Sequence, residues 1–325
     1  MTRWLVRFKR IFLVIILLAF TSRSICHGAV KLDALGVYLT SQGYGGAQLV
    51  HSGNYYHLPI LSNNKPANLV VDTGAPTTLI YRSSANKLGL TESKTEMFES
   101  GLFGSSRRTF GKASMGVLTT GNCTLMNVPV AIASDVGYNR GYGDPNGLLG
   151  LREMVKFGAI LDLNSRLIYL RPTRPGETVA AGVKAILTRQ GWSPVDLSVA
   201  HLHLRVPAKI NDVPCHLLVD TGSYLTTLDR NFAARAKIGG TPTEWTAYGI
   251  GKSGGEIRVA SFASMWVSNY QIKHASASVV GMDAEMLSRG TDSEIEGLLG
   301  AEYLSLNSAV FDFVSGTLYM RPRSH

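Results

Sequence analysis

Short apolar runs separated by turn residues recur along the chain, and the same order of runs appears twice. A strand-like segment at 56–61 leads through a turn that contains asparagine to the apolar run 69–71. The segment 203–210 leads in the same way to the apolar run 217–219. Runs of this length, bounded by turn residues, predict β strands buried in a sheet.

Helical patterns are confined to short segments, which also come in pairs. One pair ends at a glycine, a common C-terminal signal of a helix; its members are 33–42 and 179–190. The other pair is polar and follows the buried runs, at 83–88 and 231–237. We therefore predict an all-β class of fold, mostly β with few and short helices.

The two halves of the chain match in register. The triplet Asp-Thr-Gly that begins at Asp72 recurs 148 residues later at Asp220. Two further motifs recur in the same order: Gly-Leu-Leu-Gly at 147–150 and 297–300, and Tyr-Leu-Arg-Pro at 169–172, matched by Tyr-Met-Arg-Pro at 319–322. A shared order of motifs over this length indicates a duplication. We predict two homologous lobes, at 30–175 and 176–325, joined by a short linker rich in proline and glycine.

Composition and charge narrow the class of protein. The 325 residues are 45% hydrophobic and 17% charged, which is typical of a globular chain. Of the formal charge of +9, five positive charges lie in the first 23 residues, so the remainder carries about +4. No basic run with interleaved aromatic residues occurs there, which disfavours a nucleic-acid partner.

The N-terminal segment has the pattern of an export signal. A basic stretch, Arg3 to Arg10, precedes ten apolar residues from Ile11 to Phe20. Ten residues match the core of a signal peptide and fall short of the roughly 20 needed to span a bilayer. We expect 1–29 to be a signal peptide, with an uncleaved membrane anchor as the alternative. In both cases the body is exported, to the periplasm or the outside of the cell, and membrane association follows only if the leader stays.

Cysteine and histidine residues leave alternatives open. Cys123 and Cys215, one in each half, could form a disulfide or remain two buried free thiols. His201 and His203 would share one face of a strand. A zinc site needs further ligands at suitable spacing, and none is evident, so we expect instead the exposed face of an edge strand.

The repeated Asp-Thr-Gly triplets place two carboxylates in one site if the lobes face each other. Two adjacent carboxylates cannot both ionise cheaply, so the pair holds one proton over a wide pH range. The ionised acid can draw a proton from a water molecule, while the protonated acid donates one to an amide carbonyl. Water then attacks the amide directly. This chemistry needs no serine or cysteine nucleophile, no metal and no cofactor.

The neighbours of the two acids, Asp72 and Asp220, have roles that follow from their chemistry. We expect Thr73 and Thr221 to hydrogen-bond across to the opposite loop, and we expect Gly74 and Gly222 to bring backbone N–H groups close to the carboxylates. The pair differs at one adjacent position: Ser223 offers a hydroxyl to Asp220, whereas Ala75 offers none to Asp72. We therefore predict that Asp72 is the more readily protonated acid.

The doubled motifs, Val-Val-Asp-Thr-Gly-Ala and Leu-Val-Asp-Thr-Gly-Ser with Gly-Leu-Leu-Gly after each, resemble those of aspartic peptidases of the retropepsin and pepsin superfamily. The resemblance implies two β-barrel lobes related by a pseudo-twofold axis, with Asp72 and Asp220 as the catalytic dyad. It also implies a flap hairpin over an extended peptide. The flap candidates are Gly101, Leu102 and Phe103 in the first lobe and Tyr248, Gly249 and Ile250 in the second.

The resemblance implies an endopeptidase acting on peptides or proteins, as a monomer with the site between its lobes. One alternative is a non-catalytic relative in which the lobes serve as a peptide-binding or scaffold module. Another is a site formed between two chains. Both triplets are intact, which favours the enzyme, and the short linker favours lobes that pair within one chain.

Overall fold

The structure is a computed structural model that describes residues 32–101, 104–134, 144–200, 203–248, 253–273, 275–283, 287–288 and 293–322. The predicted signal peptide lies outside this range, as do Leu102, Phe103, Gly249 and Ile250 of the predicted flaps. From Asp33 onward the chain forms one compact unit. No helix in the described ranges is long and apolar enough to cross a membrane.

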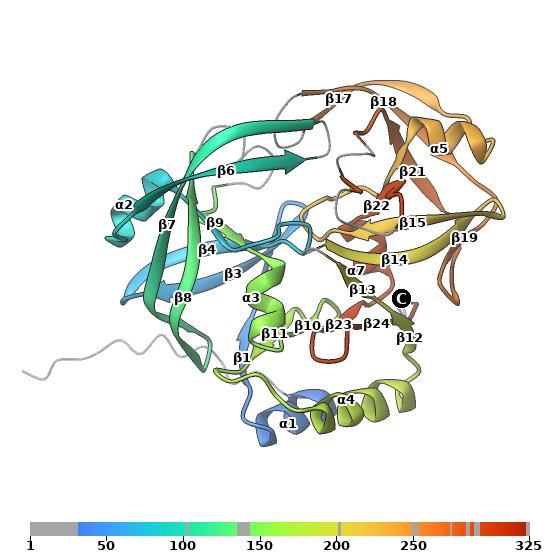
Figure 1. The fold of residues 1–325 in the computed structure, drawn as a ribbon. Helices are drawn as coiled ribbons and strands as arrows, with labels where there is room; N and C mark the ends of the chain where they lie inside the picture. The colour runs from blue at the N-terminus through green and yellow to red at the C-terminus, as the bar shows by residue number, and fades with distance from the viewer. Residues whose placement is uncertain are drawn as a thin grey trace, which may run out of the picture. The chain divides into compact units, whose positions relative to one another are not determined.

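In the described part of its first half, the chain alternates strands with short helices (Figure 1). Its elements are α1 (Ala34–Ser41), β1 (Gly45–Gln48), β2 (Val50–Ser52), β3 (Tyr55–Ser62), β4 (Lys65–Val71), β5 (Leu79–Tyr81), α2 (Arg82–Leu88), β6 (Ser93–Gly101), β7 (Gly104–Thr120), β8 (Cys123–Ala133), β9 (Gly147–Leu149), α3 (Leu151–Lys156), β10 (Ile160–Asp162) and β11 (Leu167–Leu170).

The second half repeats this order. Its elements are α4 (Glu177–Arg189), β12 (Ser193–Asp196), β13 (Ser198–Ala200), β14 (His203–Ile210), β15 (Val213–Val219), β16 (Thr227–Asp229), α5 (Arg230–Arg235), β17 (Thr241–Tyr248), β18 (Ser253–Ser261), β19 (Met265–Val267), β20 (Tyr270–Ile272), β21 (Ser276–Val280), β22 (Gly297–Leu299), α7 (Ala301–Leu306), β23 (Val310–Asp312) and β24 (Thr317–Met320). The predicted helices and strands are confirmed to within a few residues.

Local signals explain where these elements turn and end. The turn between β3 and β4 places Asn63 and Asn64 at φ of 48° and 65°, and asparagine tolerates this left-handed region well. The turn between β14 and β15 is built in the same way. Helices α1 and α4 are each followed by a glycine with positive φ, Gly43 and Gly191.

The strands form two lobes of the predicted barrel type. In the first lobe, β3, β4, β9, β5, β8 and β7 close into a ring because β7 also pairs with β3. In the second lobe the same path runs through β14, β15, β22, β16, β21 and β18. There the strand equivalent to β7 is interrupted, and the separate strand β19 pairs with β14.

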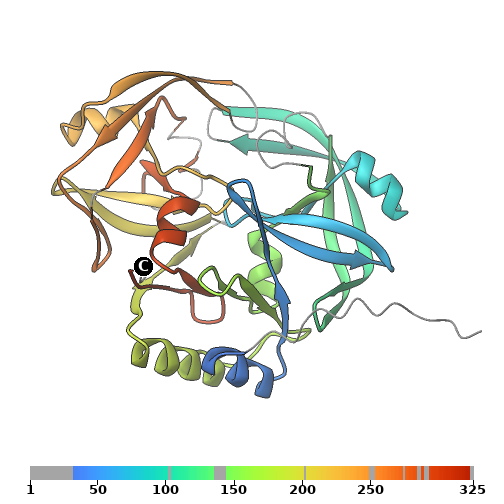
Figure 2. The same cartoon turned by 180° about the vertical axis from the view of Figure 1, so that it is seen from behind.

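A six-stranded sheet joins the lobes, with three strands from each half in the order β1-β11-β10-β23-β24-β12. At its centre Leu161 pairs with Phe311, its own counterpart in the repeat, as expected at a pseudo-twofold axis. Helices α1 and α4 pack together on this sheet and form an apolar cluster with it (Figures 1 and 2). The sequence predicts the two lobes but not this shared sheet.

The core is continuous between the lobes, and both cysteines belong to it. One apolar cluster takes in residues of both barrels and of the joining sheet, including Leu69, Leu217 and Phe311. Cys123 and Cys215 are buried in this cluster and are free thiols. Of the two alternatives for the cysteines, the structure has the unpaired one.

The repeated Gly-Leu-Leu-Gly segment threads a narrow passage in each lobe. Strand β9 runs parallel to β4 and antiparallel to β5, with its leucines buried. A Cβ atom on Gly150 would lie 2.2 Å from the carbonyl carbon of Thr77, and one on Gly300 would lie 2.5 Å from that of Leu225. These glycines give the acid-bearing loop room to pass.

The substitution Gly150→Ala tests this passage. Because the new methyl group meets backbone atoms that cannot move aside, we expect a loss of stability of about 1–3 kcal/mol in chemical denaturation. Gly239→Ala is the matched control, since Gly239 is exposed and a Cβ atom there meets nothing within 4 Å. Equal stability of the two variants would contradict the steric argument.

Candidate active site

Each half of the repeat delivers one acid to the same place between the lobes. Asp72 follows β4 directly, and its N–H group donates to the carbonyl of Leu149 on β9 at 3.0 Å. Asp220 follows β15, and its N–H group donates to the carbonyl of Leu299 on β22, also at 3.0 Å. The backbone of each acid is therefore anchored to a buried parallel strand.

Two threonines connect the acid loops of the two lobes. The N–H group of Thr73 donates to Oγ1 of Thr221, and the N–H group of Thr221 donates to Oγ1 of Thr73, both at 3.0 Å. Each hydroxyl in turn donates to a carbonyl of the other lobe, Thr73 to Val219 at 2.8 Å and Thr221 to Val71 at 2.7 Å. Both threonines are fully buried. The predicted contact across the lobes is present as four reciprocal bonds.

These bonds hold the two carboxyl groups against each other. A Cβ atom on Gly74 would lie 2.4 Å from Cγ of Asp220, and one on Gly222 would lie 2.4 Å from Cγ of Asp72. The charge of Asp220 raises the pKa of Asp72, so the two carboxyl groups lie within interaction range of each other. The glycine of each lobe therefore leaves space for the acid of the other, so any larger residue at Gly74 or Gly222 would force the acids apart.

Backbone N–H groups also converge on the two acids. Oδ1 of Asp72 accepts bonds from the N–H groups of Gly74 and Ala75, each at 2.9 Å. Oδ1 of Asp220 accepts a bond from the N–H group of Gly222 at 2.8 Å. Such bonds favour the ionised carboxylate and oppose the effect of burial on the pKa.

The electrostatics place the shared proton on Asp72. Burial, and then the negative charge of Asp220, raise the pKa of Asp72 well above its ordinary value. Burial also raises the pKa of Asp220, but the backbone N–H group of Gly222 first, and the neighbouring Asp72 carboxyl group next, lower it in part. The site therefore favours a carboxylic acid at Asp72 beside a carboxylate at Asp220.

The predicted cause of this asymmetry is wrong, although its direction agrees with the structure. The hydroxyl of Ser223 donates to the carbonyl of Leu225 at 3.0 Å, within its own loop, and not to Asp220. The inequality of the acids comes instead from the deeper burial of Asp72, from the charge of Asp220 beside it and from the backbone N–H groups that lower the pKa of Asp220.

Two glutamates behind the acid loops were not predicted. Oε2 of Glu153, a fully buried side chain, accepts a bond from the N–H group of Thr78 at 2.7 Å, and Oε1 of Glu302 accepts one from the N–H group of Thr226. Burial raises the pKa of Glu302. The sequence does contain a signal for this pair, a glutamate shortly after Gly-Leu-Leu-Gly in each half. The signal is hidden because the two glutamates differ by one position relative to that motif.

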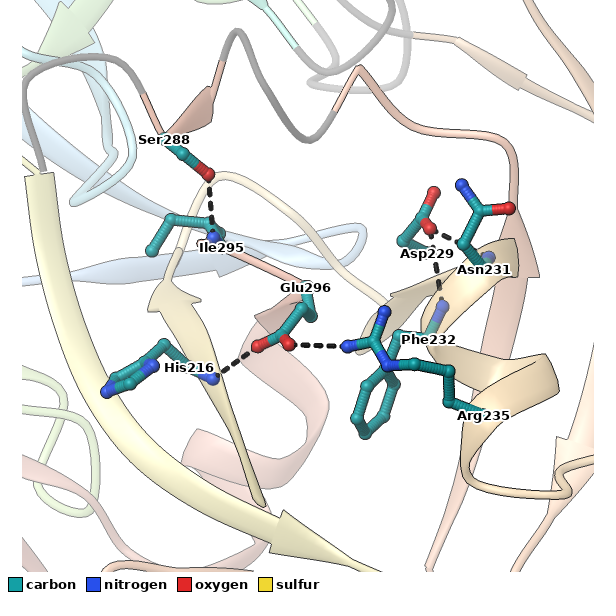
Figure 3. Close-up of polar contacts among 8 residues, drawn as sticks. All are labelled: His216, Asp229, Asn231, Phe232, Arg235, Ser288, Ile295 and Glu296. Carbon is teal, nitrogen blue, oxygen red and sulfur yellow. Dashed lines mark hydrogen bonds and ion pairs between the residues drawn. The ribbon is translucent and has the colours of Figure 1, made fainter. Parts of the chain in front are cut away.

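A third glutamate, Glu296, supports the acid-bearing strand of the second lobe (Figure 3). Glu296 accepts a bond from the N–H group of His216 at 2.8 Å and forms an ion pair with Arg235 at 2.7 Å. In the first lobe Asn146 holds the equivalent place and accepts a bond from the N–H group of Asn68 at 2.7 Å. The last residue before the buried strands β9 and β22 is therefore tied to the acid-bearing strand in both lobes.

The predicted flaps are hairpins in both lobes. Strands β6 and β7 pair up to Gly101 and Gly104, and strands β17 and β18 pair up to Tyr248 and Ser253. Both hairpins lie on the side of the joining sheet away from α1 and α4 (Figures 1 and 2). Their tips fall outside the described residues.

The prediction for the histidines needs one correction. His203 is half-buried on β14, which pairs with both β13 and β15, so it does not lie on an edge strand. His201 falls outside the described residues. Within the described ranges, no group of three or more His, Cys, Asp or Glu side chains is placed to hold a metal ion.

Two barrel lobes with an Asp-Thr-Gly loop from each, joined by threonine hydrogen bonds, define a bilobal protein of the acid-protease type. The family model for aspartyl proteases matches the chain twice, at residues 58–152 and 206–303. The chain belongs to this family, and each match covers the acid loop of one lobe. Peptides are accordingly its general class of substrate. No curated protein matches the sequence.

The substitution Thr221→Val tests the connection between the lobes. It leaves the N–H group of Thr73 and the carbonyl of Val71 buried without their partner, and each such group costs about 1–3 kcal/mol. We expect a corresponding loss in the free energy of unfolding, largely restored in Thr221→Ser. The exposed Thr124→Val is the control, and a Thr221→Val protein as stable as this control would contradict the role of the bonds.

The pH dependence of stability tests the buried acids. Because the pKa of Asp72 is higher in the folded than in the unfolded protein, its contribution to stability is complete below the unfolded value and is lost as the pH rises through the folded value. Burial lowers the pKa of His57 and opposes this trend at acid pH. We therefore compare variants. Asp72→Asn should reduce the fall in Tm between pH 5 and pH 7, whereas the exposed Asp196→Asn should leave that fall unchanged. Equal slopes in both variants would contradict the assignment.

Proposed function

We propose that the protein is an exported aspartic endopeptidase that hydrolyses peptide bonds with the dyad Asp72 and Asp220. The observation that carries this proposal is a pair of carboxyl groups, one from each lobe, each packed against the glycine of the opposite acid loop, on loops joined by reciprocal bonds. Family membership supports the reaction class. The unequal environments of the two acids supply the acid and the base that the reaction needs.

The reaction proceeds by direct attack of water on the peptide carbonyl. Asp220, as the carboxylate, takes one proton from the water molecule. The oxygen of that water molecule then forms the new bond to the carbonyl carbon. Asp72 as carboxylic acid gives its proton to the carbonyl oxygen, which yields a tetrahedral diol. Asp220 then gives its proton to the amide nitrogen, the carbon–nitrogen bond breaks, and Asp72 regains a proton from a hydroxyl of the diol. Both acids return to their starting states.

The cross-lobe bonds support a monomer as the active form. Thr73 and Thr221 connect the two acid loops within one chain, so a complete dyad needs no second molecule. The alternative of sites formed between chains gains no support from this arrangement. The flap hairpins β6–β7 and β17–β18 fit a role in holding an extended peptide over the dyad.

The N-terminal leader, residues 1–29, supports export and indicates where the enzyme would meet its substrates. The pattern of 1–29 supports delivery to the periplasm or the outside of the cell, where the enzyme would meet protein substrates. If the leader is retained, the same catalytic body is held at a membrane surface. A size comparison of the mature and full-length proteins distinguishes these cases.

Cleavage of an unfolded protein by the purified enzyme between about pH 3 and 7, where such a dyad shares one proton, tests the function. We expect Asp72→Asn and Asp220→Asn each to lower the rate by at least about 10²-fold, because each removes a general acid or base. Asp196→Asn, far from the dyad in sequence and exposed, serves as the control. Cleavage that survives both dyad substitutions would contradict the mechanism. Peptide binding without cleavage in the wild type would favour the non-catalytic relative.

A further inference from the structure

The sheet of the first lobe carries a buried apolar cluster whose edge lies next to the acids. One face of this sheet packs into the shared core, and the other carries a separate cluster, formed by Val70, Leu79, Tyr81, Phe110, Ala131, Ala133 and Leu148. Two half-buried residues, Tyr55 and Ala75, pack against this second cluster. Because Ala75 donates its N–H group to Asp72, this face of the sheet reaches the dyad. We call it the first-lobe face.

The equivalent face of the second lobe keeps part of this apolar cluster, with Leu218 and Leu298 in the places of Val70 and Leu148, but it is polar at several other places. The strand pairings set His203 in the place of Tyr55, Thr227 in the place of Leu79, Asp229 in the place of Tyr81, Ser278 in the place of Ala131, and Ser223 in the place of Ala75. Their neighbours Leu204, Leu228 and Val279 lie in the shared core, so strand alternation points the polar residues to the other face. We call this the second-lobe face.

Most polar groups of the second-lobe face are already bonded inside the protein. Oγ1 of Thr227 and Oγ of Ser278 are 2.7 Å apart, and Asp229 accepts a bond from the N–H group of Met282 at 3.0 Å. Asp229 also accepts a bond from the N–H group of Asn231 at 2.7 Å (Figure 3). Thr227, Asp229 and Ser278 are themselves buried, so the accessible part of this face is set by the half-buried His203 and Ser223. Tyr55, at the position that matches His203, is also half-buried.

Tyr55 lies within electrostatic range of both acids. Burial raises the pKa of its phenol first, and the charges of Asp220 and then Asp72 raise it further. Its packing against the same cluster as Ala75 places the ring beside the acid loop of the first lobe, and the charge of Asp220 acts on its pKa more strongly than that of Asp72. A substrate side chain that enters on this side meets an aromatic ring and a methyl group. One that enters on the side of Asp220 meets an imidazole and a hydroxyl-bearing residue.

We propose that the site, if it is the peptidase site argued above, accepts unlike side chains on the two sides of the bond that is cut. The first-lobe face takes an apolar side chain, best an aromatic one, against Tyr55 and Ala75. The second-lobe face takes a polar side chain against His203 and Ser223. The two positions Tyr55 and His203 set this difference, since burial of an unpaired polar group on an apolar surface is unfavourable.

A cleavage profile on a mixed peptide library tests the proposal. The wild type should prefer apolar residues on one side of the cut and polar residues on the other. In His203→Tyr the polar preference should shift toward apolar residues by about tenfold in kcat/KM ratio, with the opposite side unchanged. In Tyr55→His the apolar preference should weaken by a similar factor, whereas Tyr55→Phe should retain it.

Controls separate this proposal from the peptidase function and from misfolding. Tyr38→His, on α1 and away from both faces, should keep the wild-type profile, and the Tm of every variant shows whether it is folded. Cleavage by the wild type with the same apolar preference on both sides overturns this inference and leaves the peptidase function standing. A profile that His203→Tyr does not change also overturns it. No cleavage of any peptide by the wild type overturns both.

Discussion

The reciprocal hydrogen bonds between Thr73 and Thr221 are the constraint on which the site depends. They link backbone to side chain in both directions and are fully buried, so breaking one leaves polar groups without water or partner. Each hydroxyl also reaches the last residue of the opposite acid-bearing strand. The backbone of the two acid loops is therefore held in place, and this determines where the two carboxyl groups lie.

This fixed geometry explains why the acids can share a proton. Two buried carboxyl groups held together repel each other when both are ionised, and the protein has no means of separating them. Bonds from backbone N–H groups keep one acid ionised, while burial and the neighbouring charge keep the other protonated. The joining sheet contributes to the same rigidity, because its central strands β10 and β23 pair across the pseudo-twofold axis. The dyad that the proposed function needs therefore lowers the free energy of unfolding, and contacts in the rest of the fold offset this loss.

Much of this arrangement could be predicted from the sequence, because the duplication made each motif confirm its partner. The acids, the threonine contact and the passage of Gly150 all follow from local chemistry that is repeated. The bond of the Ser223 hydroxyl could not be predicted, since a nearby carbonyl in its own turn competes for the same proton. The joining sheet and the support from Glu302 could not be predicted, because they depend on contacts between distant segments. The pair Glu153 and Glu302 was also hard to recognise, because the two residues differ by one position relative to the repeated motif. The tips of the two flap hairpins remain predictions.

The central claim, that Asp72 and Asp220 form one coupled acid–base pair, is tested most directly by titrating their side-chain carboxyl groups. Carbon-13 NMR of labelled aspartate, assigned with the single Asn variants, follows each carboxyl group through the pH range. The account predicts that Asp72 keeps its proton well above the ordinary pKa of aspartate, and that its pKa falls when Asp220→Asn removes the neighbouring charge. Two independent titrations near the ordinary value, unaffected by substitution of the other acid, would contradict it.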